Sequence, residues 1–210
     1  MLKTKVAKLH TEFFKDHGFT LNPSLNQFEK DFPNGKQVIS IQIIDCKNEK
    51  YLEYQLGVYI NVVEELIKQY TSTICGYKAQ SITLAQTPDK LGSTYPKEIK
   101  ISNIEELPSL INSIKIFFLE TGFKWLDKMI DPIKLEQEFL HQKEIAFEDC
   151  SLVENAFRST ALSKIFNPID YPILRRTFLK KINSLELTPF SIASFLQFLN
   201  YLDNLNMEAA

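Results

Sequence analysis

An alternating run of residues constrains the fold of this chain more than any other feature. Between residues 52 and 62, every even position carries a large apolar or tyrosine side chain, and the odd positions include Glu53, Gln55 and Asn61. The even positions are Leu52, Tyr54, Leu56, Val58, Ile60 and Val62. Because side chains alternate between the two faces of a strand, the run predicts a strand with one buried and one wet face. This pattern is typical of an antiparallel sheet that is covered on one side.

Shorter runs of the same kind lie on either side of this strand. Strands are predicted at 27–32, 37–44, 81–86 and 97–102. Pro33-Asn34-Gly35 indicates a tight turn between the first two, and Asn-Gly tolerates the positive φ of hairpin turns. Residues 63–70 could extend the long strand or form a helical turn. The sequence therefore predicts an antiparallel sheet of four or five strands across residues 25–102.

Helical spacing dominates the rest of the chain. Leu2, Val6, Leu9 and Phe13 form an apolar stripe that predicts an N-terminal helix. After residue 103 the strand pattern stops. Further helices are predicted at 107–118, 125–129, 133–141, 152–165, 168–183 and 189–204. Strands gathered before helices indicate an α+β fold with helices packed on one face of the sheet.

The length of 210 residues corresponds to one or two domains. We expect an α+β domain over residues 1–130 and a helical extension over residues 131–210. The extension is expected to pack on the first domain, so that the two form one compact unit.

Composition and charge exclude several classes of protein. The net charge of −2 does not favour nucleic-acid binding, and no apolar run is long enough for a membrane span. The first residues lack an apolar signal core, which favours the cytoplasm.

Cys46, Cys75 and Cys150 are an odd, widely spaced set and are expected to be reduced thiols. Lysine outnumbers arginine 21 to 3, a hint of a bacterial, AT-rich genome.

Residues that could carry chemistry are few. His10 and His17 are seven residues apart, or about 10 Å along a helix, which is too far for one shared metal ion. His141 lies near the end of a predicted helix, where a cation would be favourable. The sequence contains no phosphate-binding glycine loop and no nucleophile elbow. We therefore predict that the protein is not an enzyme and uses no cofactor or metal.

The helical half divides its charge along the chain. Residues 105–154 carry 11 acidic and 5 basic side chains, whereas residues 155–187 carry 6 basic and 2 acidic ones. Pairing between neighbouring helices would explain this division. The alternative is a charged recognition surface, for which the candidate residues are Glu136, Glu138, Arg175 and Arg176.

The last predicted helix is apolar around nearly all of its circumference. Nine of its residues are large and apolar: Phe190, Ile192, Phe195, Leu196, Phe198, Leu199, Tyr201, Leu202 and Leu205. Such a helix is either buried between others or offers one face to a partner. A homodimer through this helix is one form that such a contact could take.

Four segments resemble a family of bacterial domains of unknown function (number forty-three-oh-four). The N-terminal helix ends in Gly18-Phe19, the next strand begins with Asn26-Gln27-Phe28, and Gln42 lies among aliphatic residues. The segment from Phe118 to Lys128 is similar to a later helix of that family. The resemblance covers residues 1–130 and brings no catalytic residues with it. Related small α+β domains are found near toxin and immunity loci, which implies a binding role by association.

These features together predict a cytoplasmic bacterial module that binds another protein. Its more specific form would be an immunity-type protein that masks a toxin. The alternative is a small-molecule-binding or hydrolytic domain with a pocket between the sheet and the helices. The candidate lining of such a pocket is Tyr54, Tyr59, Trp125 and Tyr171.

Overall fold

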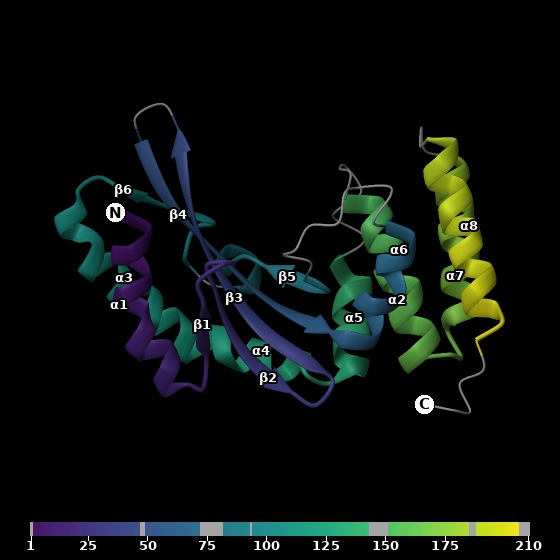
Figure 1. Ribbon diagram of the computed structural model, residues 1–210, viewed down its shortest axis with the longest axis horizontal. Coiled ribbons are helices and arrows are strands. Elements are labelled where there is room, and N and C mark those ends of the chain that lie inside the picture. Colours follow the sequence, from purple (N-terminus) through teal and green to yellow (C-terminus); the bar gives the residue numbers. More distant parts are fainter. Residues whose placement is uncertain are drawn as a thin grey trace. The chain divides into compact units, whose positions relative to one another are not determined.

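The computed structural model describes residues 2–46, 49–71, 82–92, 94–142, 151–184 and 188–205. This part of the chain has the predicted α+β class, with an N-terminal helix, an antiparallel sheet and then helices (Figure 1). The chain divides into two compact units. The first comprises Met1–Ile60 and Leu84–Ile130, and the second comprises Asn61–Thr83 and Asp131–Ala210. In this division, segment Asn61–Thr83 groups with the C-terminal helices.

The sheet of the first unit is antiparallel throughout and has its long strands in the middle. The strands are β1 (Thr20–Asn22), β2 (Gln27–Phe32), β3 (Gly35–Cys46), β4 (Glu49–Ile60), β5 (Leu84–Gln86) and β6 (Glu98–Ile101). β1 to β4 lie side by side in chain order. β5 pairs with β4 at residues 56–58, and β6 pairs with it at residues 50–53. The two short strands thus form one interrupted edge, with the 3-10 helix η1 (Pro88–Leu91) between them in the chain.

The hairpin between β2 and β3 has the predicted tight turn but not the expected positive φ. Phe32 pairs with Gly35, so that Pro33 and Asn34 form the loop. Neither Asn34 nor Gly35 has a positive φ, which among the described residues occurs only at Gly18, Asn26 and Gly92. Gly35 is required for another reason, since a Cβ atom there would lie 1.8 Å from the carbonyl oxygen of Tyr59. Glycine therefore permits the close approach of β3 to β4 at this point.

The alternating run forms β4 as predicted, except at its end. The even positions from Leu52 to Ile60 are buried on the face that packs against helices. Val62 does not continue this row, because the strand ends at Ile60 and helix α2 (Asn61–Thr71) begins at the next residue. Val62 is 42% exposed, whereas Val63 and Ile67 form the buried side of α2. The helical reading of residues 63–70 is therefore the correct one.

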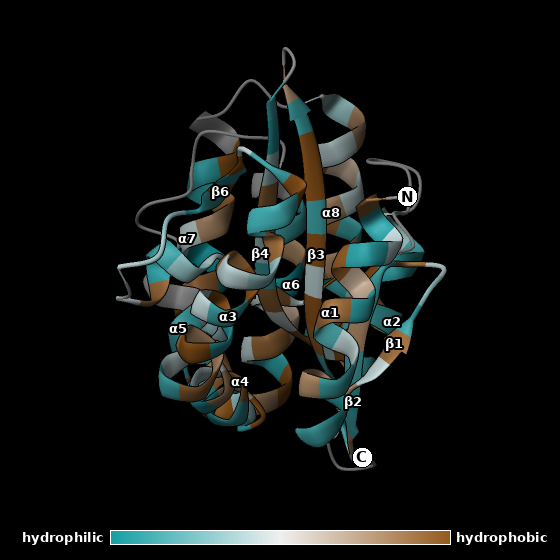
Figure 2. Ribbon diagram, turned by 90° about the vertical axis from the view of Figure 1, so that its left-hand side faces the viewer, coloured by the Kyte–Doolittle hydropathy of each residue, from teal (hydrophilic) through white to brown (hydrophobic). Residues whose placement is uncertain are grey.

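Two helical segments cover the apolar face of the sheet. α1 (Leu2–Asp16) contributes Phe14, whose ring lies 4.6 Å from that of Phe28 on β2 and 5.0 Å from that of Phe118. Brown bands along β3 mark the apolar residues of the same sheet (Figure 2). Burial of these aromatic rings stabilises this unit.

The second segment is a continuous helix with a π turn inside it. It follows the 3-10 turn η2 (Ile104–Glu106) and consists of α3 (Leu107–Phe117), the π turn η3 (Phe118–Gly122) and α4 (Phe123–Met129). The two helices predicted at 107–118 and 125–129 are thus one continuous helix, and Gly122 lies within it. A Cβ atom at Gly122 would lie 2.8 Å from Cδ1 of Phe118 and 3.0 Å from Cδ2 of Leu56. The glycine lets the π turn approach β4 closely.

The second unit is a bundle around one buried helix. The buried helix is α6 (Ser151–Phe166). It contacts α2, α5 (Pro132–Gln142), α7 (Tyr171–Ser184) and α8 (Pro189–Asp203). Residues 156–163 of α6 are buried without interruption. The ring of Phe157 lies 5.1 Å from that of Phe195 and 4.9 Å from that of Phe198. The helices predicted at 133–141, 152–165, 168–183 and 189–204 are confirmed, with each end within three residues.

We expect Gly122→Ala to destabilise the first unit by about 1–3 kcal/mol, the usual cost of overpacking a core. Without the contacts to Phe118 and Leu56, the same change would stabilise a helix by about 1 kcal/mol. Urea unfolding measures the difference. Glu120→Ala, at an exposed position of the same π turn, is the control and should change stability by no more than about 0.5 kcal/mol. A Gly122→Ala protein as stable as the wild type would contradict the proposed packing role.

Candidate functional site

Only some of the residues predicted to form a charged surface are exposed. Glu136 on α5 is 2% exposed, which corrects its assignment to a recognition surface. It adjoins the buried Leu135, and α5 turns this side toward α6. Glu138 is half-buried. The acidic stretch of the sequence therefore does not form a continuous exposed face, because the period of the helix turns part of it into the bundle.

The two neighbouring arginines of α7 have different environments. Arg175 binds Asp203 at the end of α8, with Nε at 3.1 and 3.0 Å from its two carboxylate oxygens. The hydroxyl of Tyr171 donates to the same carboxylate at 2.9 Å. Burial and this bond raise the pKa of Tyr171. Arg176 is exposed and forms no ion pair within the described part of the chain. Arg175 therefore fastens α7 to α8, and only Arg176 offers its charge to solvent.

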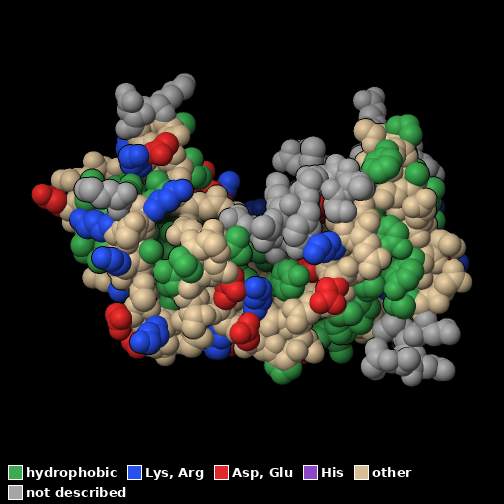
Figure 3. Space-filling model, viewed as in Figure 1, with side chains coloured by type: hydrophobic (Ala, Val, Ile, Leu, Met, Phe, Trp, Pro, Cys, Tyr) green, Lys and Arg blue, Asp and Glu red, His purple; other side chains and the backbone are tan. Residues whose placement is uncertain are grey.

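The outer face of α8 carries no charge. Phe190, Leu196 and Tyr201 are 57%, 46% and 39% exposed, respectively. The remaining exposed positions before Asp203 are Pro189, Ala193, Gln197 and Asn200. The opposite side, with Phe195, Phe198 and Leu202, is buried in the bundle. Hydrophobic side chains gather along α8 in the space-filling view (Figure 3). The helix thus has one face in the core and one apolar, uncharged face in solvent.

The four aromatic residues proposed for a pocket belong to both faces of the sheet and to both units. Tyr54 and Tyr59 are five residues apart on β4 and therefore lie on opposite faces of the sheet. Trp125 belongs to α4 of the first unit, and its Nε1 has no hydrogen-bond partner among the described residues. Tyr171 belongs to the second unit and is bonded to Asp203.

His10 and Tyr54 form a buried polar pair in the first unit. Nδ1 of His10 lies 2.8 Å from the carbonyl oxygen of Val6 and must carry the proton, because a carbonyl only accepts. Nε2 then accepts from the hydroxyl of Tyr54 at 3.0 Å. Burial lowers the pKa of His10 from 6.5 to about 4, partly opposed by the Val6 bond and helped by the charge of Lys115. His10 is thus a neutral core residue. His17 bonds the carbonyl of Phe13 at 2.7 Å.

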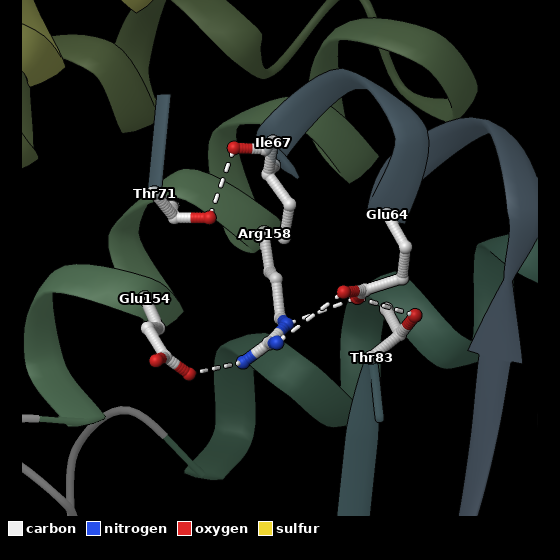
Figure 4. Close-up of polar contacts among 6 residues, drawn as sticks. All are labelled: Glu64, Ile67, Thr71, Thr83, Glu154 and Arg158. Atoms are coloured by element: carbon white, nitrogen blue, oxygen red, sulfur yellow. Dashed lines mark hydrogen bonds and ion pairs between the residues drawn. The ribbon is translucent and has the colours of Figure 1, made fainter. Parts of the chain in front are cut away.

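An ion-pair network that the sequence analysis missed joins α2 to α6. Arg158 lies between two carboxylates in Figure 4: its Nε is 3.0 Å from Glu64 Oε1, and its Nη1 is 3.1 Å from Glu154 Oε2. Nη2 lies 3.3 Å from the other oxygen of Glu64, and Thr83 donates to Glu64 at 2.8 Å. Burial disfavours the charged guanidinium, but the two carboxylates outweigh it and raise the pKa of Arg158. All three guanidinium nitrogens have partners, so the network holds helices together and offers no reactive group.

One sequence signal could have revealed this network. Arg158 is the single charged residue of the run from 155 to 163, which otherwise consists of apolar, hydroxyl and amide residues. Glu154 lies four residues before it, the spacing of a helical ion pair. The second carboxylate, Glu64, is 94 residues away and has no such signal.

The structure describes few of the other candidate residues. Cys46 is an exposed free thiol, and Cys75 and Cys150 lie outside the described residues. His141 lies in the last turn of α5, as predicted, but its side chain also lies outside them. In the part of the chain that the structure describes, no three histidine, cysteine, aspartate or glutamate side chains are grouped to hold a metal ion. None of the described helices is long and apolar enough to cross a membrane.

Comparison with models of known protein families, with curated proteins and with solved structures gave no significant match. The resemblance over residues 1–130 to a family of unknown function therefore stays a prediction.

Stability should depend on pH through His10. Because its pKa is about 4 in the folded protein and 6.5 when exposed, the unfolded chain takes up a proton first as the pH falls. The contribution of His10 to stability is complete above pH 6.5 and falls by about 3 kcal/mol by pH 4. Urea unfolding across this range should show a shallower pH dependence in the double variant His10→Leu/Tyr54→Phe. His17→Gln, on the same helix, should leave the profile unchanged, and equal effects of the two would contradict this assignment.

The ion network predicts a second effect on stability. Arg158→Met leaves the buried carboxylate of Glu64 without its cation, which should cost about 3–5 kcal/mol in urea unfolding. Adding Glu64→Leu to this variant should recover much of the loss, because no buried charge then remains. Arg175→Met removes a partly exposed pair and should cost no more than about 1 kcal/mol. A similar loss for the two single variants would refute the special role of burial at Arg158.

Proposed function

We propose that the protein is a non-catalytic module that binds another protein through the outer faces of α7 and α8. We call this the α7–α8 surface and define it by Arg176, Lys180, Phe190, Leu196 and Tyr201. The observation that carries the proposal is the uncharged outer face of α8, with three large apolar side chains in solvent. Helices that stay in water usually present charged residues on that side. Apolar groups gathered on an exposed face are instead typical of contact sites.

The neighbouring helix indicates the charge of the partner. α7 contains four basic residues and no acidic one, and Arg175 is neutralised by Asp203. Arg176 and Lys180 remain exposed on α7. The two helices are neighbours, since the ring of Phe178 packs 6.2 Å from that of Phe195. The surface therefore fits a partner with an apolar ridge bordered by acidic side chains, and opposite charges would speed their encounter.

An immunity-type role is the more specific form of this proposal. In that role the α7–α8 surface would cover the active site of a toxin, which requires complementary shape and charge but no catalytic group. The family resemblance supports this form by association with toxin and immunity loci. A bacterial cytoplasmic location is proposed with it, and the lysine-rich composition supports the bacterial origin.

The test places a photo-crosslinking amino acid at Gln197, in the middle of the outer face of α8, and identifies the captured protein in a bacterial host. The partner is then purified, and its affinity for the variants is measured by calorimetry. Leu196→Glu should weaken binding by tenfold or more, a loss of about 1.4 kcal/mol. Arg176→Glu should weaken it most at low salt, because the lost attraction is screened by ions.

Ile133→Glu is the matched control, since it introduces the same charge at an exposed apolar position of α5. It should leave the affinity unchanged. Equal losses for Leu196→Glu and Ile133→Glu would overturn the proposed surface. A homodimer that Leu196→Glu dissociates would make a second copy of this chain the occupant and would also overturn the proposal of a different partner.

A further inference from the structure

A carboxylate lies in the interior of the second unit with one oxygen unpaired. Glu136 on α5 is 2% exposed, and its Oε1 has no hydrogen-bond partner among the described residues. Its Oε2 is 3.5 Å from Nδ2 of Asn167, a long contact. An ionised carboxylate in such a place is costly unless a cation or several strong donors accompany it. The buried Glu64 of the same unit shows the contrast, because a guanidinium and a hydroxyl satisfy it.

A second carboxylate shares the partner of Glu136. Nδ2 of Asn167 also donates to Asp170, at 2.9 Å. One amide nitrogen thus lies within reach of an oxygen from each carboxylate, although a neutral amide compensates neither charge. No ammonium or guanidinium group of the described residues forms an ion pair with either of them. A cation bound between the two carboxylates would compensate the charge of both.

The ends of two helices border this group. α6 ends at Phe166, so that Asn167 follows directly on its C-terminal turn, where the helix dipole is negative. Asp170 directly precedes α7 and therefore lies at the positive end of that helix. The backbone N–H of Asn167 donates to the carbonyl of Ser163, which holds the side chain of Asn167 at the end of α6. Asp170 is exposed and Asn167 half-buried, so the group opens to solvent on one side.

We propose that Glu136, Asn167 and Asp170 form a binding site for a hydrated divalent cation of the Mg²⁺ or Mn²⁺ class. Carboxylate and amide oxygens are the ligands that these ions prefer. Rotation of the Asn167 amide by half a turn would exchange Nδ2 for Oδ1 and place a third oxygen toward the two carboxylates. Mg²⁺ is commonly held by one or two carboxylates and keeps several waters, which fits a site with few protein ligands and one open side.

The test measures Mn²⁺ binding to the chelator-treated full chain by electron paramagnetic resonance, where free and bound Mn²⁺ give different signals. A saturable site should appear in the wild type. Glu136→Gln keeps the shape of the side chain and removes its charge. This variant and the exposed Asp170→Asn should each weaken Mn²⁺ binding by at least the 10–100-fold that loss of an outer-shell partner costs.

Glu138→Gln is the matched control, because it removes the same charge from the same helix. It should bind Mn²⁺ as the wild type does, and Mg²⁺ should displace Mn²⁺ and raise the unfolding temperature in both. The proposal is overturned if the wild type binds no Mn²⁺, if Glu136→Gln and Asp170→Asn bind it unchanged, or if K⁺ at equal ionic strength stabilises the protein to the same extent. Asp170→Asn keeps the test decisive if Glu136→Gln does not fold.

Discussion

The fold of the first unit depends on β4 being paired along both edges while one of its faces is buried. β3 pairs with its whole length, and β5 and β6 divide the other edge between them. Its even-numbered side chains are therefore buried against the helical segments that carry Phe14 and Phe118. A shift of one residue in register would turn this whole row to the other face. Gly35 and Gly122 follow from the same constraint, because each admits a neighbouring element close to β4.

The second unit is organised differently, because its central helix α6 contacts four other helices. A helix with buried residues at eight successive positions must also bury its polar side chains, and each then needs a partner. Thr160 bonds the carbonyl of Ala156 on its own helix, whereas Arg158 reaches Glu64 on α2. Glu136, on the neighbouring helix α5, differs from these residues, because one oxygen of its buried carboxylate has no hydrogen-bond partner among the described residues. The contrast between Glu64 and Glu136 separates a side chain that holds the bundle together from one that can bind a ligand.

Charge along the sequence was a poor guide to charge on the surface. Glu136 of the acidic stretch is buried in the interior. In the basic stretch, Arg158 belongs to a buried ion-pair network and Arg175 is paired with Asp203. Each of these side chains meets a residue that is distant in sequence, and no local pattern reports such a meeting. The apolar character of the last helix was the better guide. One face of that helix lies in the core and the other in solvent.

The sequence by itself determined the α+β class, the course of β4 and the positions of most helices. These features follow from periodicity, because alternation and helical spacing are local consequences of backbone geometry. Only the tertiary structure decided where the strand gives way to α2, why Gly35 is needed, and which charged residues are buried. Those outcomes depend on contacts between segments far apart in the chain, such as Glu64 with Arg158 and Glu136 with Asn167. Burial is set by what packs against a residue, and a single sequence records only the residue.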